Sequence, residues 1–412
     1  MKRFVSNRQK ARKNVRLLAA ALTMFVGVTP SFAQEALREA DVVRIARARA
    51  PAAAVAEASE RLAAAQERTA GLSPNPSVGW ERETIETSGQ RQAQDMFRVN
   101  VPISIGGPRT QRSLQSVQSE WSRSMAALTR TNAVVEALHA YFDAALASQR
   151  VDVLAQALTN LEEAARIQTQ REAAGVVSGY ESTRLTIASE LARSRHIEAI
   201  GAFESSRAQL ATMLGEHDVT LDPNLRLSDL GSEAALLAQT EGRQALVHAR
   251  QAEARADEAE RRSRFAWLPT LQLGGGLNRT NTGGLGYILG LQVSLPIFNR
   301  GQNLRAVALA RQSLQSARSD ALQRNMHAEV RSALTLYQTA RDELSRFETA
   351  TQDMVETLLR AAQSGYREGE RTILELLDAQ RTQIEVNERR LALLWAAKHA
   401  ETRLRAAVGD LQ

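Results

Sequence analysis

Acidic side chains gather near one short turn of the sequence, and they are the residues best suited to act on a charged solute. Glu370 directly follows Gly369, and Glu375 and Asp378 come shortly after it. Several copies of such carboxylates around a common axis would favour cations at the mouth of a pore. The alternative is a solvated helix face, on which Asp378 pairs with Arg381 at a spacing of three residues. The residues alone leave both interpretations open.

Motifs of enzymes are absent from this chain. The sequence has no G-x-S-x-G, no P-loop and no H-E-x-x-H. The six histidines are scattered, and His139 and His327 fit ordinary polar positions of helices better than metal ligands. The methionines do not cluster, so no relay for a soft metal ion is visible. We therefore predict that the protein is not an enzyme, and we expect no cofactor and no fixed metal site.

The first 33 residues resemble a processing segment. A basic stretch is followed by the short apolar run 17–28 and by the small-x-small sequence Ser31-Phe32-Ala33, an arrangement typical of a secretory signal peptide. We predict cleavage near Gln34. The chain has 52 basic and 46 acidic residues, and seven of the basic ones lie in 1–33, which leaves 45 against 46 in the mature protein. The high isoelectric point is therefore no argument for binding nucleic acid. Cysteine is absent, so we expect no lipidated N-terminal cysteine.

Two stretches alternate between apolar and polar or small residues, which is typical of strands with one apolar face. The first runs over 97–105, and the second over 286–297. With the preceding stretches 77–87 and 270–280, they predict two β-hairpins, spanning about 77–105 and 270–297. Three residues of each alternating stretch are predicted to face lipid: Phe97, Val99, Val101, Leu289, Leu291 and Val293.

Long segments without glycine or proline follow each hairpin and predict very long helices. The segment 109–174 would reach about 100 Å at ~1.5 Å per residue. Its apolar residues recur every three or four positions, as in a coiled-coil seam. A returning helix is predicted over 178–214, and the second half predicts helices over 302–364 and 371–408.

The two halves repeat one another at an offset of 194 residues. Proline, glycine and cap residues recur at this spacing, in the pairs Pro102 and Pro296, Gly107 and Gly301, Gly175 and Gly369, Ser178 and Thr372, and Gly215 and Gly409. We therefore predict a signal peptide over 1–33, a first repeat over 34–217, a linker over 218–231 and a second repeat over 232–412. Each repeat is a helix, a β-hairpin, a long helix and a returning helix.

Four amphipathic strands cannot close a membrane barrel, because known barrels begin at about eight strands. Open strand edges are not tolerated in lipid. If the strands enter a membrane, several copies of the chain must share one barrel, and three copies would supply about 12 strands.

The mature chain resembles the TolC-like outer-membrane efflux channels over about 35–409. The motifs that carry the resemblance are the repeat itself, the strand starts at Asn75-Pro76 and Leu268-Pro269, and the segments 101–107 and 295–301 with the turns Gly175-x-x-Ser178 and Gly369-x-x-Thr372. The resemblance implies a mixed α/β membrane protein: a trimer with a 12-stranded β-barrel in the outer membrane of a Gram-negative bacterium, continued by a helical barrel across the periplasm. It also implies a periplasmic adaptor protein and an inner-membrane pump as partners.

The sequence from Pro296 to Gln302 looks like the branch of this family that serves heavy-metal cation pumps. We expect a passive export duct for such cations. The same duct serving drugs or secreted proteins is an alternative, and an exported coiled-coil scaffold without a pore is another. The alternating strands count against the scaffold.

The two turns between long helices are the predicted docking sites for the adaptor. One is apolar and the other charged, and their residues are Gly175, Val176, Val177 and Ser178, and Gly369, Glu370, Arg371 and Thr372. The alternative is that both are tight helix-to-helix turns in which glycine alone is required. Glu370, Glu375 and Asp378 are the predicted acids of the pore mouth.

Overall fold

A computed structural model describes residues 36–412, except 88, 105, 174–178 and 217. The predicted signal peptide lies outside the described residues, as does the whole apolar turn 175–178. Residues Leu37–Gln412 form one compact unit, and this unit is described below.

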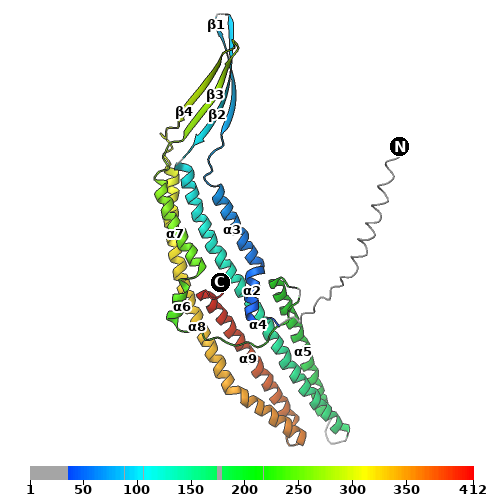
Figure 1. The fold of residues 1–412 in the computed structure, drawn as a ribbon. Helices are drawn as coiled ribbons and strands as arrows, with labels where there is room; N and C mark the ends of the chain where they lie inside the picture. Colours follow the sequence, from blue (N-terminus) through cyan, green and yellow to red (C-terminus); the bar gives the residue numbers. More distant parts are fainter. Residues whose placement is uncertain (1–35, 88, 105, 174–178, 217) are drawn as a thin grey trace, which may run out of the picture. The chain divides into compact units, whose positions relative to one another are not determined.

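Four antiparallel strands form a single sheet in the order β1-β2-β3-β4 (Figure 1). Their bounds are Ser77–Thr87, Gln90–Ile103, Leu271–Thr280 and Leu285–Val293. The two hairpins are joined edge to edge, because β2 of the first repeat pairs with β3 of the second. Strand β2 begins seven residues before the predicted start at Phe97, since the ladder with β1 continues to the turn.

Strand β4 ends at Val293, before the predicted end at Ile297. The last bond to β3 runs from Ser294 N to Thr270 O at 3.0 Å. Pro296 has no N–H to continue a ladder, and Ile297 N turns back to Leu295 O at 2.9 Å. The apolar alternation therefore continues past the strand that it predicted.

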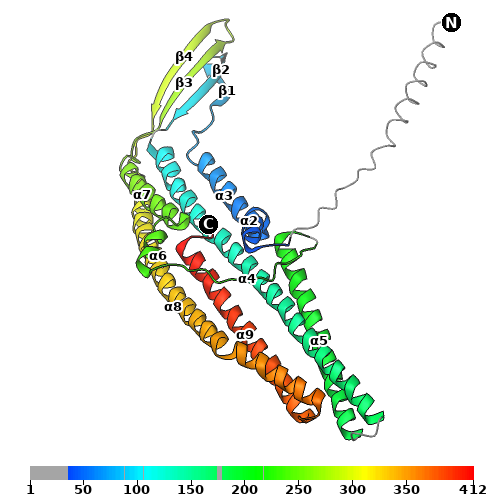
Figure 2. The same ribbon diagram turned by 60° about the horizontal axis from the view of Figure 1, so that its bottom comes forward.

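Four long helices make up most of the unit, as predicted. They are α4, Gly106–Ala173, α5, Gly179–Leu214, α8, Gln302–Glu368, and α9, Ile373–Val408. Helices α4 and α5 form one hairpin and α8 and α9 the other, and Figure 2 shows the two hairpins side by side. The turn between α8 and α9 lies at the end of the unit opposite the sheet, as do the last residues of α4 and the first residues of α5 (Figure 1).

Two of these helices extend beyond their predicted bounds. Helix α4 begins at Gly106 and includes Pro108 in its first turn, where the missing N–H of proline costs nothing. Helix α8 runs past the predicted end at 364 to Glu368. It passes through Gly365, where a Cβ would come within 2.7 Å of Arg371 Cγ, so the glycine leaves room for the side chain that packs on it.

Shorter helices precede each hairpin of strands. In the first repeat they are α2, Glu39–Arg49, and α3, Pro51–Thr69, which begins at its proline. In the second repeat the single helix predicted before the β-hairpin is wrong. The structure has α6, Glu233–Thr240, and α7, Gln244–Ser263. The chain turns between them at residues 241–243. Arg243 in this turn is buried, and its guanidinium donates to Ala407 O at 3.0 Å.

The segment that links the two repeats crosses the middle of the helices and is fixed there by side chains from both repeats. Tyr141 of α4 donates its hydroxyl to Asp222 O at 2.9 Å, and Tyr337 of α8 donates to Ser228 O. Residue Leu37 forms a parallel bridge with Leu221. Among the described residues, no helix is long and apolar enough to cross a membrane.

A buried network closes this middle region. Lys398 of α9 is 1% exposed, and its ammonium contacts Glu401 at 2.8 Å and Glu39 of α2 at 3.1 Å. It also donates to Arg226 O at 2.9 Å. The cation is therefore matched by two carboxylates and a carbonyl, as a buried charge requires.

Candidate membrane sheet and tip

One face of the sheet is apolar across all four strands in the part of the sheet nearest the helices. Directly paired residues of antiparallel strands lie on the same face, and the registers bring Val99 opposite both Val78 and Gly275, and Leu289 opposite Gly275. The apolar part of this face, called here the apolar face, comprises Val78, Trp80, Phe97, Val99, Val101, Ile103, Leu271, Leu273, Gly275, Leu277, Tyr287, Leu289, Leu291 and Val293. Nearer the hairpin turns the same side of the sheet carries Arg82, Asp95 and Arg279.

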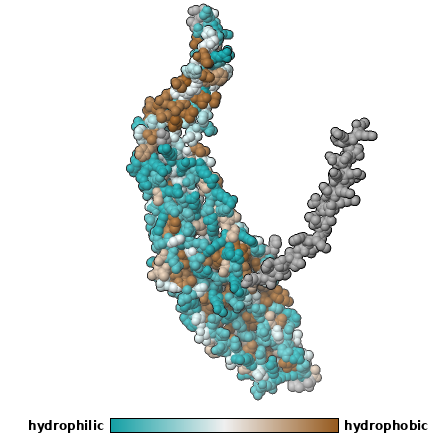
Figure 3. Space-filling model, in the orientation of Figure 1, coloured by the Kyte–Doolittle hydropathy of each residue, from teal (hydrophilic) through white to brown (hydrophobic). Residues whose placement is uncertain are grey.

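The six residues predicted to face lipid all lie on the apolar face and are exposed in the single chain. Leu289 is 91% and Tyr287 81% exposed. Figure 3 shows apolar surface gathered over the lower part of the sheet, where the helices below it are mainly hydrophilic. An exposed apolar area of this kind on a sheet indicates a surface that is covered by a partner or by lipid. Contact of these residues with lipid remains a prediction.

The opposite face of the sheet is polar. It carries Glu83, Gln94, Arg98, Asn100, Gln272, Asn278 and Gln292. Asn278 Nδ2 donates to Gln94 Oε1 at 3.0 Å across the seam between the repeats. Gly276 on this face is required by packing, because a Cβ there would lie 2.1 Å from Phe97 O. Its neighbour Gly275, on the apolar face, has no such close contact, because the nearest atom to a Cβ there is Leu289 Cδ2 at 3.9 Å.

Strands β1 and β4 each pair with only one neighbour among the described residues. Their outer edges present unpaired backbone N–H and C=O groups over the length of each strand. Such edges invite another strand, and they cannot stay open in lipid. The sheet therefore needs further strands on both sides if its apolar face enters a bilayer.

The turn between α8 and α9 is a tight cap built on glycine. Gly369 has φ of 83°, a left-handed conformation that suits glycine. The N–H groups of Glu370 and Arg371 donate to Gly365 O at 2.8 and 3.0 Å and close the end of α8. Thr372 then caps α9, since its hydroxyl accepts from Glu375 N and its own N–H donates to Glu375 Oε2 at 2.8 Å.

The three predicted acids of the pore mouth have different surroundings. Glu375 belongs to the cap of α9, and its hydrogen bonds with Thr372 lower the pKa of its carboxyl. Glu370 and Asp378 are exposed and have no ion pair among the described residues. The predicted pair of Asp378 with Arg381 is wrong, because the Arg381 guanidinium contacts Glu385 at 2.9 Å. The role of these acids at a pore stays a prediction.

Residues that the sequence did not single out hold the two helical hairpins together near their turns. Tyr366 of α8 is buried and donates its hydroxyl to Gln168 Oε1 of α4 at 2.5 Å. Arg171 of α4 donates to the carbonyls of Tyr366 and Arg367 at 3.2 and 2.8 Å. We call these four residues the tip joint. Gln168 and Arg171 are common polar types in a long helix, so only their spacing from the turn could have marked them.

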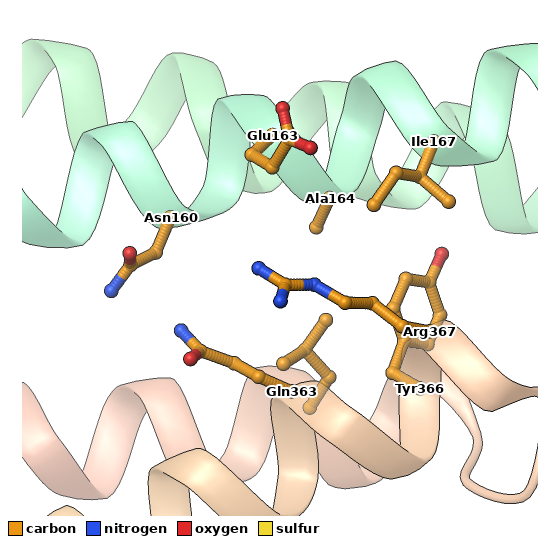
Figure 4. A pocket seen from close by; sticks show the side chains of 8 residues that line it. Asn160, Glu163, Ala164, Ile167, Gln363, Tyr366 and Arg367 are labelled. Carbon is orange, nitrogen blue, oxygen red and sulfur yellow. The ribbon is translucent and has the colours of Figure 1, made fainter.

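Small cavities accompany the tip joint. Figure 4 shows one of about 40 Å³ between α4 and α8, with Arg367 reaching across it towards Glu163 and Asn160. Farther from the turns, a groove of about 670 Å³ separates α5 from α9. The ion pair between Arg150 and Glu388, at 2.8 Å, crosses that groove. The hairpins are thus less closely packed here than the strands are in the sheet.

His139 does not occupy the ordinary polar position predicted for it. Its ring stacks on His399 of α9 with centroids 4.0 Å apart. His399 Nε2 and Trp395 Nε1 both contact Asp143 Oδ1, at 3.2 and 2.6 Å. Burial, and then the neighbouring His399, lower the pKa of His139 to about 4. In the part of the chain that the structure describes, no three histidine or acidic residues are grouped to hold a metal ion.

An amphipathic antiparallel sheet with open edges, joined to two long helical hairpins that repeat one another, is the architecture that the resemblance to TolC-like channels predicts. The family model described as Outer membrane efflux protein matches residues 237–410.

Two relatives have names that refer to metals. The cobalt-zinc-cadmium resistance protein CzcC of Cupriavidus metallidurans is 25% identical over 363 residues, covering 82% of this chain and 81% of the relative. The nickel-cobalt-cadmium resistance protein NccC of Alcaligenes xylosoxydans xylosoxydans is 26% identical over 300 residues, 70% of this chain and 67% of the relative.

Solved structures share the fold. The Campylobacter jejuni CmeC outer membrane channel superposes with a TM-score of 0.71 at 17% identity, over 90% of this chain and 85% of that one. The resemblance to the TolC-like outer-membrane efflux channels, and to their heavy-metal branch, is therefore confirmed. So are the mixed α/β fold of two tandem repeats and the localisation in the outer membrane.

Proposed function

We propose that this protein is the outer-membrane duct of a tripartite efflux system and that it exports heavy-metal cations. In this proposal three copies share one barrel of about 12 strands, in the range of known membrane barrels. A periplasmic adaptor and an inner-membrane pump supply the cargo and the energy. The duct itself is passive, and cations are its cargo and have no fixed site within it.

The observation that carries the proposal is the four-stranded sheet with one continuous apolar face and two open edges. Lipid would cover the apolar face, and strands of neighbouring copies would cover the edges at β1 and β4. The polar face would then line a water-filled lumen. The names of the two metal-resistance relatives support cations as cargo over the alternatives of drugs or secreted proteins.

Engineered cysteines test the shared barrel, and the chain has no native cysteine to interfere. Single cysteines at Glu81 and Glu83 on β1 would be combined in turn with cysteines at Ile288, Gly290 and Gln292 on β4. Oxidation should give covalent dimers and trimers on a denaturing gel for the pairs in register. As a control, Met96→Cys with Asn278→Cys, which are paired within one chain, should give no increase in mass. A protein that stays monomeric in every combination would exclude the shared barrel.

The predicted docking turns are tested by function in cells. Val177→Asp should leave expression and trimer assembly unchanged and abolish resistance to cobalt, zinc or cadmium, because it puts a charge into the apolar turn that the adaptor is expected to contact. A variant with full resistance would mean that the adaptor binds elsewhere on the helices. Resistance to detergents or drugs in place of metals would favour the alternative cargo.

A further inference from the structure

A cavity of about 640 Å³ lies where α4 begins and α7 ends, directly below the sheet. It combines arginines from two helices with apolar side chains. The residues that line it are Gly106, Arg109, Thr110, Arg112, Arg262, Phe265 and Leu268. Phe265 is 60% exposed, and Trp267 close by is 52% exposed. Aromatic side chains at this level are typical of the boundary between a bilayer and water.

A second cavity lies close to this one, around the opposite side of α4. Successive helical residues are about 100° apart, so Arg109 and Gln111 point in nearly opposite directions from α4. Gln111 lines the second cavity, together with Ser104 and Thr270, and Leu268 lines both cavities. Arg109 therefore points away from Gln111, and its exposure to lipid belongs to the inference drawn below.

Two of the arginines have no counter-ion. Arg109 and Arg112 are exposed, and neither has a hydrogen bond or ion pair among the described residues. Arg262 is different, because it contacts Glu258 and donates to Ser113 Oγ at 3.0 Å. The cavity thus holds two guanidinium groups that are free to bind an anion. Guanidinium groups match the oxygens of a phosphate in pairs of hydrogen bonds.

The cavity lies below the two inner strands of the chain, so it would stay open to lipid when several copies assemble. Helix α4 follows β2, and helix α7 precedes β3. Strands β2 and β3 are the two inner strands of the sheet. A neighbouring copy would pair with β1 or β4, so the cavity would not be covered by the strands of another copy.

We propose that this cavity binds the phosphate of an anionic phospholipid in the membrane leaflet nearest the helices. Arg109 and Arg112 hold the phosphate oxygens, while Phe265 and Leu268 contact the first carbons of the acyl chains. The protein would carry one such lipid per copy, as a ring around the base of the sheet. The inference rests on the lipid-facing role of the apolar face in the proposed function, and adds to it a specific headgroup site.

Native mass spectrometry of the detergent-purified full protein tests the site, with phosphatidylglycerol and phosphatidylethanolamine of equal chain length as probes. Wild-type protein should retain phosphatidylglycerol in preference. Arg109→Gln with Arg112→Gln should weaken that binding about 25-fold, taking about fivefold for each cation near an anionic headgroup. The pair Arg109→Lys and Arg112→Lys should retain most of it. As a matched control, Arg324→Gln with Arg346→Gln removes two exposed arginines of α8 and should leave binding unchanged.

Three results would overturn the lipid site: equal binding of the two lipids, unchanged phosphatidylglycerol binding in the double glutamine variant, or inorganic phosphate binding as tightly as the lipid. If the double variant does not assemble, the lysine pair and the two single glutamine variants decide the same question. Failure of the proposed function looks different, because the wild-type protein would then form no trimer and conduct no ions, whichever lipid it retained. A conducting trimer that is indifferent to the arginines would contradict the lipid site alone.

Discussion

The two repeats meet at the sheet and at the helical turns, and the two junctions are built differently. In the sheet, β2 and β3 are joined by a backbone ladder over ten residue pairs, from Gln94 with Thr280 to Ile103 with Leu271. At the turns, side chains make the junction through the tip joint and a cluster of buried apolar residues. A backbone ladder is held by main-chain hydrogen bonds, so most side-chain changes leave its geometry intact. A side-chain junction can separate while both hairpins stay folded. The comparison therefore predicts that any opening or closing motion takes place at the helical turns and leaves the sheet unchanged.

The largest expected effect comes from breaking the seam of the sheet. Gly276→Val should abolish assembly, because its Cβ would lie 2.1 Å from Phe97 O and the ladder could not close. We expect a loss on the order of 4 kcal/mol or more, in the range of severe packing defects. The readout is the yield of heat-resistant oligomer in outer-membrane extracts.

Gly275→Val is the matched control for the seam. It adds the same side chain one position away, on the apolar face, where the nearest atom is Leu289 Cδ2 at 3.9 Å. Its oligomer yield should be close to that of wild type. Equal loss in both variants would mean that valine is not tolerated in β3 for reasons other than the seam.

The faces of the sheet give the next largest effect. Leu291→Arg or Val99→Arg should impair insertion by about 2–4 kcal/mol if the residues lie near the bilayer midplane. Gln292→Arg, one position along on the polar face, should be milder. The measurement is the amount of folded protein in lipid vesicles as denaturant is varied. Equal tolerance at the two positions would contradict the assignment of the apolar face to lipid.

Loosening the tip joint should have a smaller effect on stability and a visible effect on conductance. Arg171→Gln removes the two hydrogen bonds to the carbonyls at the end of α8, at a cost of about 1–3 kcal/mol for bonds from a charged donor. Assembly should be retained, and the open time in a planar bilayer should increase.

Arg166→Gln is the control for the tip joint. Arg166 lies on the same helix, and its partner Glu163 is also on α4, so the substitution leaves the junction between the repeats intact. Wild-type conductance in the Arg171 variant would show that the tip joint does not restrain the channel.

A pH-dependent effect is expected at the contact between His139 and His399, which joins the repeats through α4 and α9. The folded-state pKa of His139, about 4, lies below its ordinary value of 6.5. Its stabilising contribution is therefore complete above pH 6.5 and is lost as the pH falls towards 4, by up to about 3 kcal/mol. The melting temperature should fall between pH 7 and pH 5. His139→Gln should reduce this fall, and His196→Gln on α5 should not.

Sequence patterns predicted the helices and strands of this fold well where the apolar residues recur at one regular spacing. The alternation of Val99 and Leu291 gave the strands and their faces, because a sheet with one covered face requires it. Local chemistry was harder to predict. Gly107 and Gly301 are matched by the repeat, yet the close contacts are made by Gly106 and Gly301, which both pack against the segment Phe265–Ala266. The two glycines that contact this segment do not occupy matching positions of the repeat, because Gly106 precedes the matched Gly107 by one residue. A fixed offset between the repeats cannot show such a difference.

The residues of the candidate site show the same contrast between regular patterns and local contacts. The residues of the apolar face could be predicted because each contributes to a regular pattern. The tip joint could not, since Gln168 and Tyr366 lie on different repeats and nothing in either segment marks the other as its partner. Arg109 and Arg112 were missed for a similar reason, because a pair of arginines in a helix becomes informative only when the absence of nearby acids is known.

The pairing of Leu37 with the linker has a consequence for the order of folding. Leu37 N donates to Thr220 O at 2.7 Å, and Glu39 contacts Lys398, 359 residues away. A chain that emerges with its N-terminus first would therefore expose this segment long before its partners exist. Contacts between residues so far apart in sequence form late and slowly. The segment after the predicted cleavage site would thus be the last part to dock. Its docking would require that the chain has been synthesised at least as far as Lys398.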